Sequence, residues 1–102
     1  MLVRLSIVED VFELSGRGSV VVAPGIPRSP DWHVRAGDAV RIRRPDGTEA
    51  DTDIQGIEMM SPPSPLGWAI MLGIGLTKAD VPLGSELLVD SERFKPGLTE
   101  VD

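Results

Sequence analysis

The chain has 102 residues, of which 41% are hydrophobic, and these values are typical of one small globular domain with its own core. It contains no cysteine, which excludes disulfides, thiolate chemistry and cysteine-liganded zinc and favours a cytoplasmic setting. The formal net charge is −6 and the Lys and Arg residues are scattered, so the basic footprint of an autonomous nucleic-acid-binding domain is missing.

The N-terminal part of the chain predicts two strands. Residues 2–7 alternate, with Val3, Leu5 and Ile7 expected on one face. Residues 18–23 are small, β-branched and apolar on both faces, which is typical of a strand that is buried on both sides.

The middle of the chain predicts a loop followed by a hairpin. Residues 24–30 hold three prolines and a glycine and predict the loop. Residues 38–43 alternate as a strand, and residues 45–47 have the turn sequence Pro-Asp-Gly. Residues 48–60 form the expected partner strand. The alternation of its inward-facing residues is interrupted around Gly56, which indicates a β-bulge.

The C-terminal part predicts two further strands, over residues 68–72 and 86–89, and one helical turn over residues 77–80. Six short strands with closely spaced turns favour a β-barrel over residues 1–90. The polar residues 91–102 are expected to be a flexible tail.

Several sequence segments match one known pattern. Residues 8–22 combine an acidic pair, an aromatic residue, the run Ser-Gly-Arg-Gly and a β-branched strand. Residues 34–42 add a basic residue, Gly-Asp and an alternating strand; residues 55–59 read Gln-Gly-Ile-Glu-Met, and residues 75–87 end in Gly-x-x-Leu. In this order the segments resemble the second domain of elongation factor Tu and related translational GTPases, over roughly residues 5–89. The resemblance implies an all-β fold, a six-stranded antiparallel Greek-key barrel.

The chain also departs from that family. It contains no Gly-x-x-x-x-Gly-Lys-Ser/Thr phosphate loop, which excludes GTP hydrolysis by this chain alone. Residues 24–32 are an insertion relative to the usual hairpin. Trp68 stands where the family has a polar contact residue.

The resemblance implies a ligand site, since this barrel helps to hold the aminoacylated end of tRNA in the elongation factor. Glu9, Asp10 and Phe12 match pocket residues there, and Glu58 matches the glutamate at the ribose of the terminal adenosine. Carboxylates accept hydrogen bonds from ribose hydroxyls, and Phe12 would supply an apolar wall. The alternative is structural: Glu9 or Asp10 pairs with Arg17, and Phe12 lies in the core.

Three other residues are candidates by type. Trp32 and Trp68 are either contact residues at a binding surface or plugs at the ends of the barrel. His33 is the only histidine and has no matching cluster, so neither a metal site nor a Ser-His-Asp triad is expected.

An alternating acidic strand faces a basic one across the turn at residues 45–47, and cross-strand ion pairing on a solvated face explains it better than cation binding. The acidic residues are Glu49, Asp51 and Asp53, and the basic residues are Arg41, Arg43 and Arg44.

These observations predict a non-catalytic binding or docking module that acts through protein–protein contacts, with a second copy among the candidate partners. The alternative is a translation-associated module that binds aminoacyl-tRNA or an RNA 3′ end, which the net charge disfavours. An enzyme is the weakest hypothesis, and no cofactor, metal or DNA partner is expected. No membrane partner is expected either, because the longest apolar stretch is too short to span a bilayer. The candidate contact residues are Glu9, Asp10, Phe12, Arg17, Trp32, Glu58 and Trp68.

Overall fold

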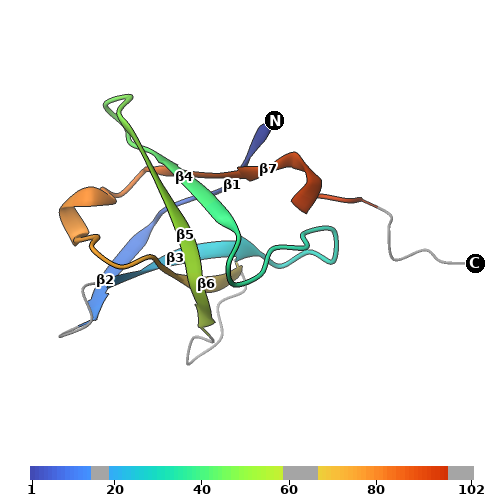
Figure 1. The fold of residues 1–102 in the computed structure, drawn as a ribbon, viewed down its shortest axis with the longest axis horizontal. Helices are drawn as coiled ribbons and strands as arrows, with labels where there is room; N and C mark the ends of the chain where they lie inside the picture. The colour runs from blue at the N-terminus through green and yellow to red at the C-terminus, as the bar shows by residue number, and fades with distance from the viewer. Residues whose placement is uncertain (15–18, 59–66, 97–102) are drawn as a thin grey trace, which may run out of the picture.

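The computed structural model describes residues 1–14, 19–58 and 67–96 (Figure 1). Within these ranges the chain forms β-strands and two short 3₁₀ helices, and no α-helix. No helix in these ranges is long and apolar enough to cross a bilayer. The elements are β1 (Leu2–Ile7), β2 (Asp10–Leu14), β3 (Ser19–Pro27), β4 (Ala39–Arg43), β5 (Glu49–Glu58), β6 (Gly67–Leu72), η1 (Lys78–Asp80), β7 (Glu86–Asp90) and η2 (Ser91–Arg93).

The strands form one antiparallel sheet in the order β1-β7-β4-β5-β6-β3-β2. Its two outermost strands, β1 and β2, are consecutive in the chain and separated only by Val8 and Glu9. The Val8 amide donates to the Ser85 carbonyl oxygen at 2.8 Å, and the Glu9 amide donates to the Ala23 carbonyl oxygen at 2.8 Å. This corner therefore passes from the β7 side of the sheet to the β3 side.

A single main core lies on the inner face of the sheet and receives side chains from all seven strands. Its largest fully buried residues are Ile42, Ile54, Ile70, Leu72 and Leu87. Burying each such side chain contributes about 1.5–3 kcal/mol, so this cluster is the main source of stability.

The sheet has seven strands among the described residues, where the sequence predicts six, because β2 is a strand of its own. A second correction concerns residues 24–27, which continue β3 and are not a loop. The register shifts between Val22 and Ile26, and the Ser6 hydroxyl oxygen lies 3.0 Å and 2.7 Å from the carbonyl oxygens of Pro24 and Gly25. Pro24 lies within this irregularity, where proline is tolerated, and the pairing with β6 resumes at Ile26 and Pro27.

The residues of β1 that face the core also differ from the prediction. The register shifts between Arg4 and Ser6, so Leu5 is buried but Ile7 is 41% exposed. Val8, 1% exposed, takes the core position instead.

The predicted hairpin is confirmed. β4 and β5 pair across a turn in which Gly47 has φ +90°, a conformation that favours glycine. The predicted bulge is confirmed by the shift between Ile54 and Gly56.

Part of the expected tail is held against the body of the molecule. Residues 91–93 form η2, and Phe94 forms an isolated bridge with Trp32. The Lys95 amide donates to the Asp31 carbonyl oxygen at 2.8 Å. Residues 97–102 lie outside the described ranges.

Candidate functional site

The outward side of β2, β3 and β6 is rich in apolar side chains. In the register, Phe12 lies opposite Val21, and Val21 lies opposite Met71. Phe12 is 46% exposed on the terminal strand of the sheet. We define the outer face by this row and the rows on either side of it: Asp10, Phe12, Leu14, Val21, Ala23, Glu58, Ala69 and Met71.

The neighbouring row carries two of the predicted carboxylates. Asp10 pairs with Ala23 and Glu58 pairs with Ala69, while the two alanines belong to one apolar cluster. Three strand spacings separate β2 from β5, which is about 14 Å along the sheet. That separation exceeds the roughly 5–9.5 Å of paired catalytic carboxylates in glycoside hydrolases. Asp10 and Glu58 therefore flank an apolar strip and do not form an acid–base pair.

The structural alternative for these residues is settled in part. Phe12 is not a core residue, because Val11, 4% exposed, takes the inward position on β2. Glu9 is exposed at the corner between β1 and β2. Arg17, the expected ion-pair partner of Glu9 or Asp10, lies outside the described residues.

Trp68 does not cover the outer face. It precedes Ala69 on β6, so its side chain points to the opposite side of the sheet. There Trp68 pairs with Ile26 in the register, and its half-buried side chain packs against the main core. The guanidinium carbon of Arg28 lies 4.9 Å from the Trp68 ring centroid, a cation–π geometry.

Trp32 lies in the loop between β3 and β4, and its ring centroid is 4.7 Å from that of Phe94. The two tryptophans line one hollow of about 320 Å³, which we call the tryptophan pocket. Its apolar lining consists of Ile26, Pro27, Trp32, Val34, Ile57 and Trp68. Both tryptophans thus pack against the core and also line a surface hollow, and their roles as contact residues or as plugs at the ends of a barrel stay predictions.

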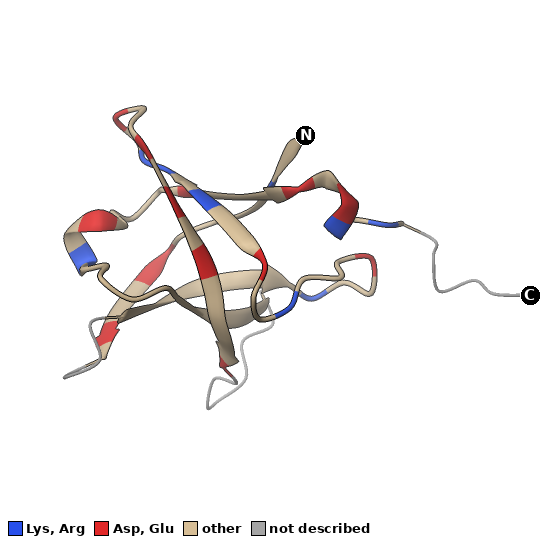
Figure 2. Cartoon of the chain, in the orientation of Figure 1, with Lys and Arg blue, Asp and Glu red and all other residues tan. Residues whose placement is uncertain are grey.

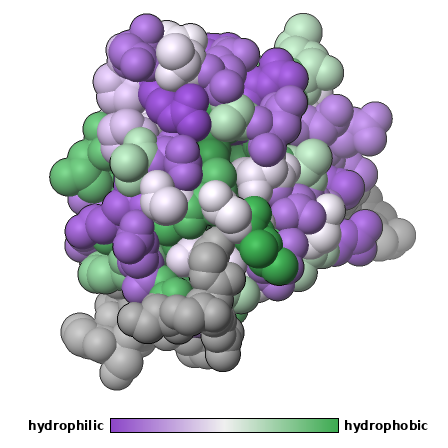
Figure 3. All heavy atoms as spheres, turned by 60° about the vertical axis from the view of Figure 1, so that its left-hand side comes forward, coloured by the Kyte–Doolittle hydropathy of each residue, from purple (hydrophilic) through white to green (hydrophobic). Residues whose placement is uncertain are grey.

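Apolar side chains also reach the surface away from these two sites. On the side of the molecule that carries η1, hydrophobic side chains appear between hydrophilic ones (Figure 3). Ile74 and Leu83 are exposed and lie outside the outer face and the tryptophan pocket. Such single exposed residues are normal on a protein surface.

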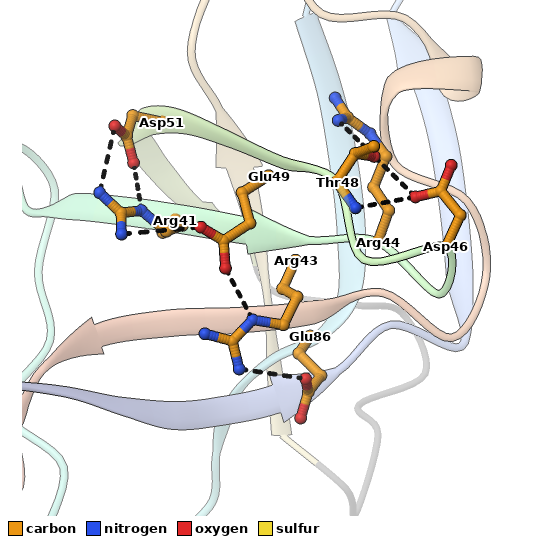
Figure 4. Close-up of polar contacts among 8 residues, drawn as sticks. All are labelled: Arg41, Arg43, Arg44, Asp46, Thr48, Glu49, Asp51 and Glu86. Carbon is orange, nitrogen blue, oxygen red and sulfur yellow. Dashed lines mark hydrogen bonds and ion pairs between the residues drawn. The ribbon is translucent and has the colours of Figure 1, made fainter.

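The face of β4, β5 and β7 carries a ladder of ion pairs (Figure 4). Arg41 Nε lies 2.8 Å from Asp51 Oδ1, and Arg43 Nε lies 2.8 Å from Glu49 Oε2. Arg43 Nη1 also approaches Glu86 Oε1 at 3.9 Å. The predicted cross-strand pairing is confirmed for these residues.

Two members of the predicted set make other contacts. Arg44 Nε donates to the Asp80 carbonyl oxygen at 2.8 Å, and Asp53 Oδ1 accepts from Gln55 Nε2 at 3.0 Å. The hydrogen bond from Arg41 lowers the pKa of Asp51 below its ordinary value. Arg41, Arg43, Glu49 and Asp51 thus pair with one another on an exposed face of the sheet.

No group of three or more His, Cys, Asp or Glu residues in the described ranges could hold a metal ion. A second hollow, of about 470 Å³, is larger than the tryptophan pocket and is lined in part by Asp38, Arg41, Asp51 and Arg93. Arg93 Nη2 lies 3.1 Å from Asp38 Oδ1, so the charges in this hollow are paired.

No protein-family model, curated protein or solved structure matches this chain. The geometry of the outer face and of the tryptophan pocket therefore carries the functional argument. The sequence indicates the carboxylates and Phe12 individually, but it does not show that Trp32 and Trp68 line the same hollow. The signals for the pocket are the insertion at residues 24–32 and the unusual tryptophan at position 68.

Proposed function

We propose that the chain is a non-catalytic docking module with a barrel of the translation-factor domain II type, which binds a partner protein through its outer face. The continuous corner at Val8 and Glu9 supports barrel closure, because it joins the two outermost strands of the sheet. The single core shared by all strands supports it further.

The exposure of Phe12 carries this proposal. Phe12 is an aromatic side chain on the terminal strand, 46% exposed beside Val21 and Met71. It has the chemistry of a contact residue and is not part of the core. The side chains of Ala23 and Ala69 beside it are short, so a side chain of the partner can approach the backbone of the sheet.

The charges of the outer face indicate the kind of partner. Its described charged residues are the carboxylates Asp10 and Glu58, with Glu9 nearby at the corner. A partner surface with apolar groups and flanking Lys or Arg would complement them. A second copy would bring like charges together, so self-association needs salt to screen them.

Affinity capture from extracts of the producing cells tests the proposal, using the wild type, Phe12→Glu and Leu83→Glu as baits. Leu83 is the matched control because it is exposed and lies outside the outer face. We expect a protein that wild type and Leu83→Glu retain and Phe12→Glu loses. Light scattering over a range of concentrations and salt detects self-association. Monomeric behaviour together with identical capture by all three baits would refute the proposal.

The second candidate is a module that binds an aminoacyl or RNA 3′ end. The observation in its favour is that Asp10, Phe12 and Glu58 share the outer face, as the resemblance to elongation factor Tu implies. Filter binding of aminoacylated tRNA at low salt tests it. Retention that falls in the Phe12→Ala, Glu58→Ala double variant would support it; no retention, or unchanged retention, would eliminate it.

A further inference from the structure

The segment after β7 returns to the body of the molecule as a short strap, which we define as residues 91–95. It begins with η2 and runs past the loop that joins β3 to β4. The His33 amide donates to the Arg93 carbonyl oxygen at 2.7 Å, and the Lys95 amide donates to the Asp31 carbonyl oxygen at 2.8 Å. Backbone hydrogen bonds in both directions therefore join the strap to this loop.

One ion pair and one aromatic contact add to these bonds. η2 ends in a basic residue, Arg93, close to the loop (Figure 2). Arg93 Nη2 lies 3.1 Å from Asp38 Oδ1, and the other carboxylate oxygen of Asp38 accepts a hydrogen bond from the Arg35 amide at 2.9 Å. The Phe94 ring centroid lies 4.7 Å from that of Trp32. Two neighbouring side chains of the strap thus contact two different points of the loop.

The strap buries little apolar surface of its own. No residue of η2 is buried, and Phe94 is 39% exposed. In β7, which directly precedes the strap, Leu87 and Val89 are fully buried. Segments with few buried apolar contacts open at a lower free energy than the strands of the core. The contacts of the strap are therefore expected to break while the sheet is still paired.

Trp32 is the residue that the strap covers. It lines the tryptophan pocket and also a neighbouring hollow of about 430 Å³, whose other lining residues are Val3, Arg4, Ser91 and Phe94. Ser91 and Phe94 belong to the strap. Release of the strap therefore removes one wall of this hollow and takes Phe94 away from the Trp32 ring.

We propose that the strap is releasable: it opens while the sheet stays folded, and its opening uncovers the Trp32 ring. The ion pair between Arg93 and Asp38 sets the fraction of molecules in which the strap is closed. The strap thus controls whether this aromatic surface is accessible. The proposal involves neither Phe12 nor the rest of the outer face, so it does not rest on the proposed docking function.

Hydrogen exchange of backbone amides in the full chain, followed by NMR at increasing urea below the unfolding transition, tests the proposal. The reporter amides are those of His33 and Lys95, which join the strap and the loop. The reference is the amide of Val8, a buried residue that donates to the Ser85 carbonyl oxygen. Opening of the strap exposes little surface, so the exchange of the reporters should hardly depend on urea, whereas that of Val8 should accelerate steeply.

Three variants separate opening of the strap from unfolding of the sheet. Arg93→Ala removes an ion pair that exists only in the closed strap, so the reporters should exchange about tenfold faster. The matched control Arg43→Ala removes ion pairs outside the strap and should leave the reporters within about twofold. Leu72→Ala weakens the core of the closed and open forms alike. It should accelerate Val8 at least about thirtyfold and leave the reporters within about twofold.

The indole N–H signals test whether opening uncovers Trp32, because Trp32 and Trp68 are the only tryptophans of the chain. Arg93→Glu places a second carboxylate beside Asp38 and favours the open strap. Its Trp32 signal should move toward the position found in Phe94→Ala, and its Trp68 signal should stay in place. Continued protection of the Val8 amide shows that these variants are folded.

Four results would overturn the proposal. The first is a urea dependence of the reporters equal to that of Val8. The second is equal acceleration of the reporters and Val8 in Leu72→Ala, because the strap would then open only when the sheet unfolds. The third is exchange of the reporters in Arg93→Ala within about twofold of wild type. The fourth is an unmoved Trp32 signal in Arg93→Glu. Phe12→Glu should leave the reporters unchanged, so failure of the outer-face docking function does not affect these results.

Discussion

Replacement of Gly25 by alanine tests how closely β3 approaches β6, which sets the position of Trp68. A Cβ at Gly25 would lie 2.7 Å from Ile70 Cγ1 and 2.7 Å from the Trp68 carbonyl oxygen. Ile70 is fully buried and the carbonyl belongs to the backbone, so neither can move aside at low cost. Such overpacking costs about 1–3 kcal/mol, which lowers the Tm of a domain of this size by roughly 4–8 °C per kcal/mol.

Gly56 provides a matched control for that change. A Cβ there would lie 3.6 Å from Met71 Cε, an ordinary contact, so Gly56→Ala should be neutral or stabilise by up to about 1 kcal/mol. Urea unfolding followed by tryptophan emission measures both variants. If Gly25→Ala unfolds within about 0.5 kcal/mol of wild type, the close approach of β3 and β6 described above is wrong.

Leu72→Ala should lower the free energy of unfolding by about 2–5 kcal/mol, whereas Met71→Ala on the outer face should cost less than about 1 kcal/mol; equal losses in urea unfolding would contradict the assigned faces of β6. Hydrogen bonds from the Thr77 amide and hydroxyl lower the pKa of Asp80 below its ordinary 3.8, so its stabilising contribution is present above pH 3.8 and disappears as the pH falls through the folded-state pKa. Asp80→Asn should weaken the fall of the urea midpoint in that acid range, and an unchanged pH profile would exclude this contribution. Arg43→Ala should destabilise by less than about 1 kcal/mol, and by less again in 1 M salt, because its ion pairs are exposed; a larger, salt-independent loss would show that the ladder supports the core.

The strands that the sequence predicts correctly are those with a clear local pattern. Arg41 and Arg43 alternate with buried residues, and Gly47 supplies the turn, so the β4–β5 hairpin follows from local rules. β2 is missed as a separate strand because only the tertiary hydrogen bonds at the Val8 corner turn the chain away from β7. The proline content alone predicts a loop over residues 24–27. In the structure these residues belong to β3, because the Ser6 hydroxyl donates to backbone carbonyl oxygens there and the pairing with β6 resumes after a register shift.

The candidate sites show the same division between local and tertiary information. The alternation of Phe12 with Val11 is local, but which of the two faces the core depends on how β2 packs, and this was left open by the sequence. The tryptophan pocket depends on the contact of Trp32 with Phe94 and on the pairing of Trp68 with Ile26, which no spacing rule encodes. Arg28 is likewise placed over Trp68 by the fold and not by any motif.

The affinity of the isolated partner for wild type, Phe12→Glu and Leu83→Glu, measured by titration calorimetry, tests the docking function most directly. The account predicts that Phe12→Glu weakens binding at least about thirtyfold, as expected for a contact residue worth 2 kcal/mol or more, while Leu83→Glu leaves the affinity unchanged. Equal affinities for the wild type and Phe12→Glu would contradict docking through the outer face.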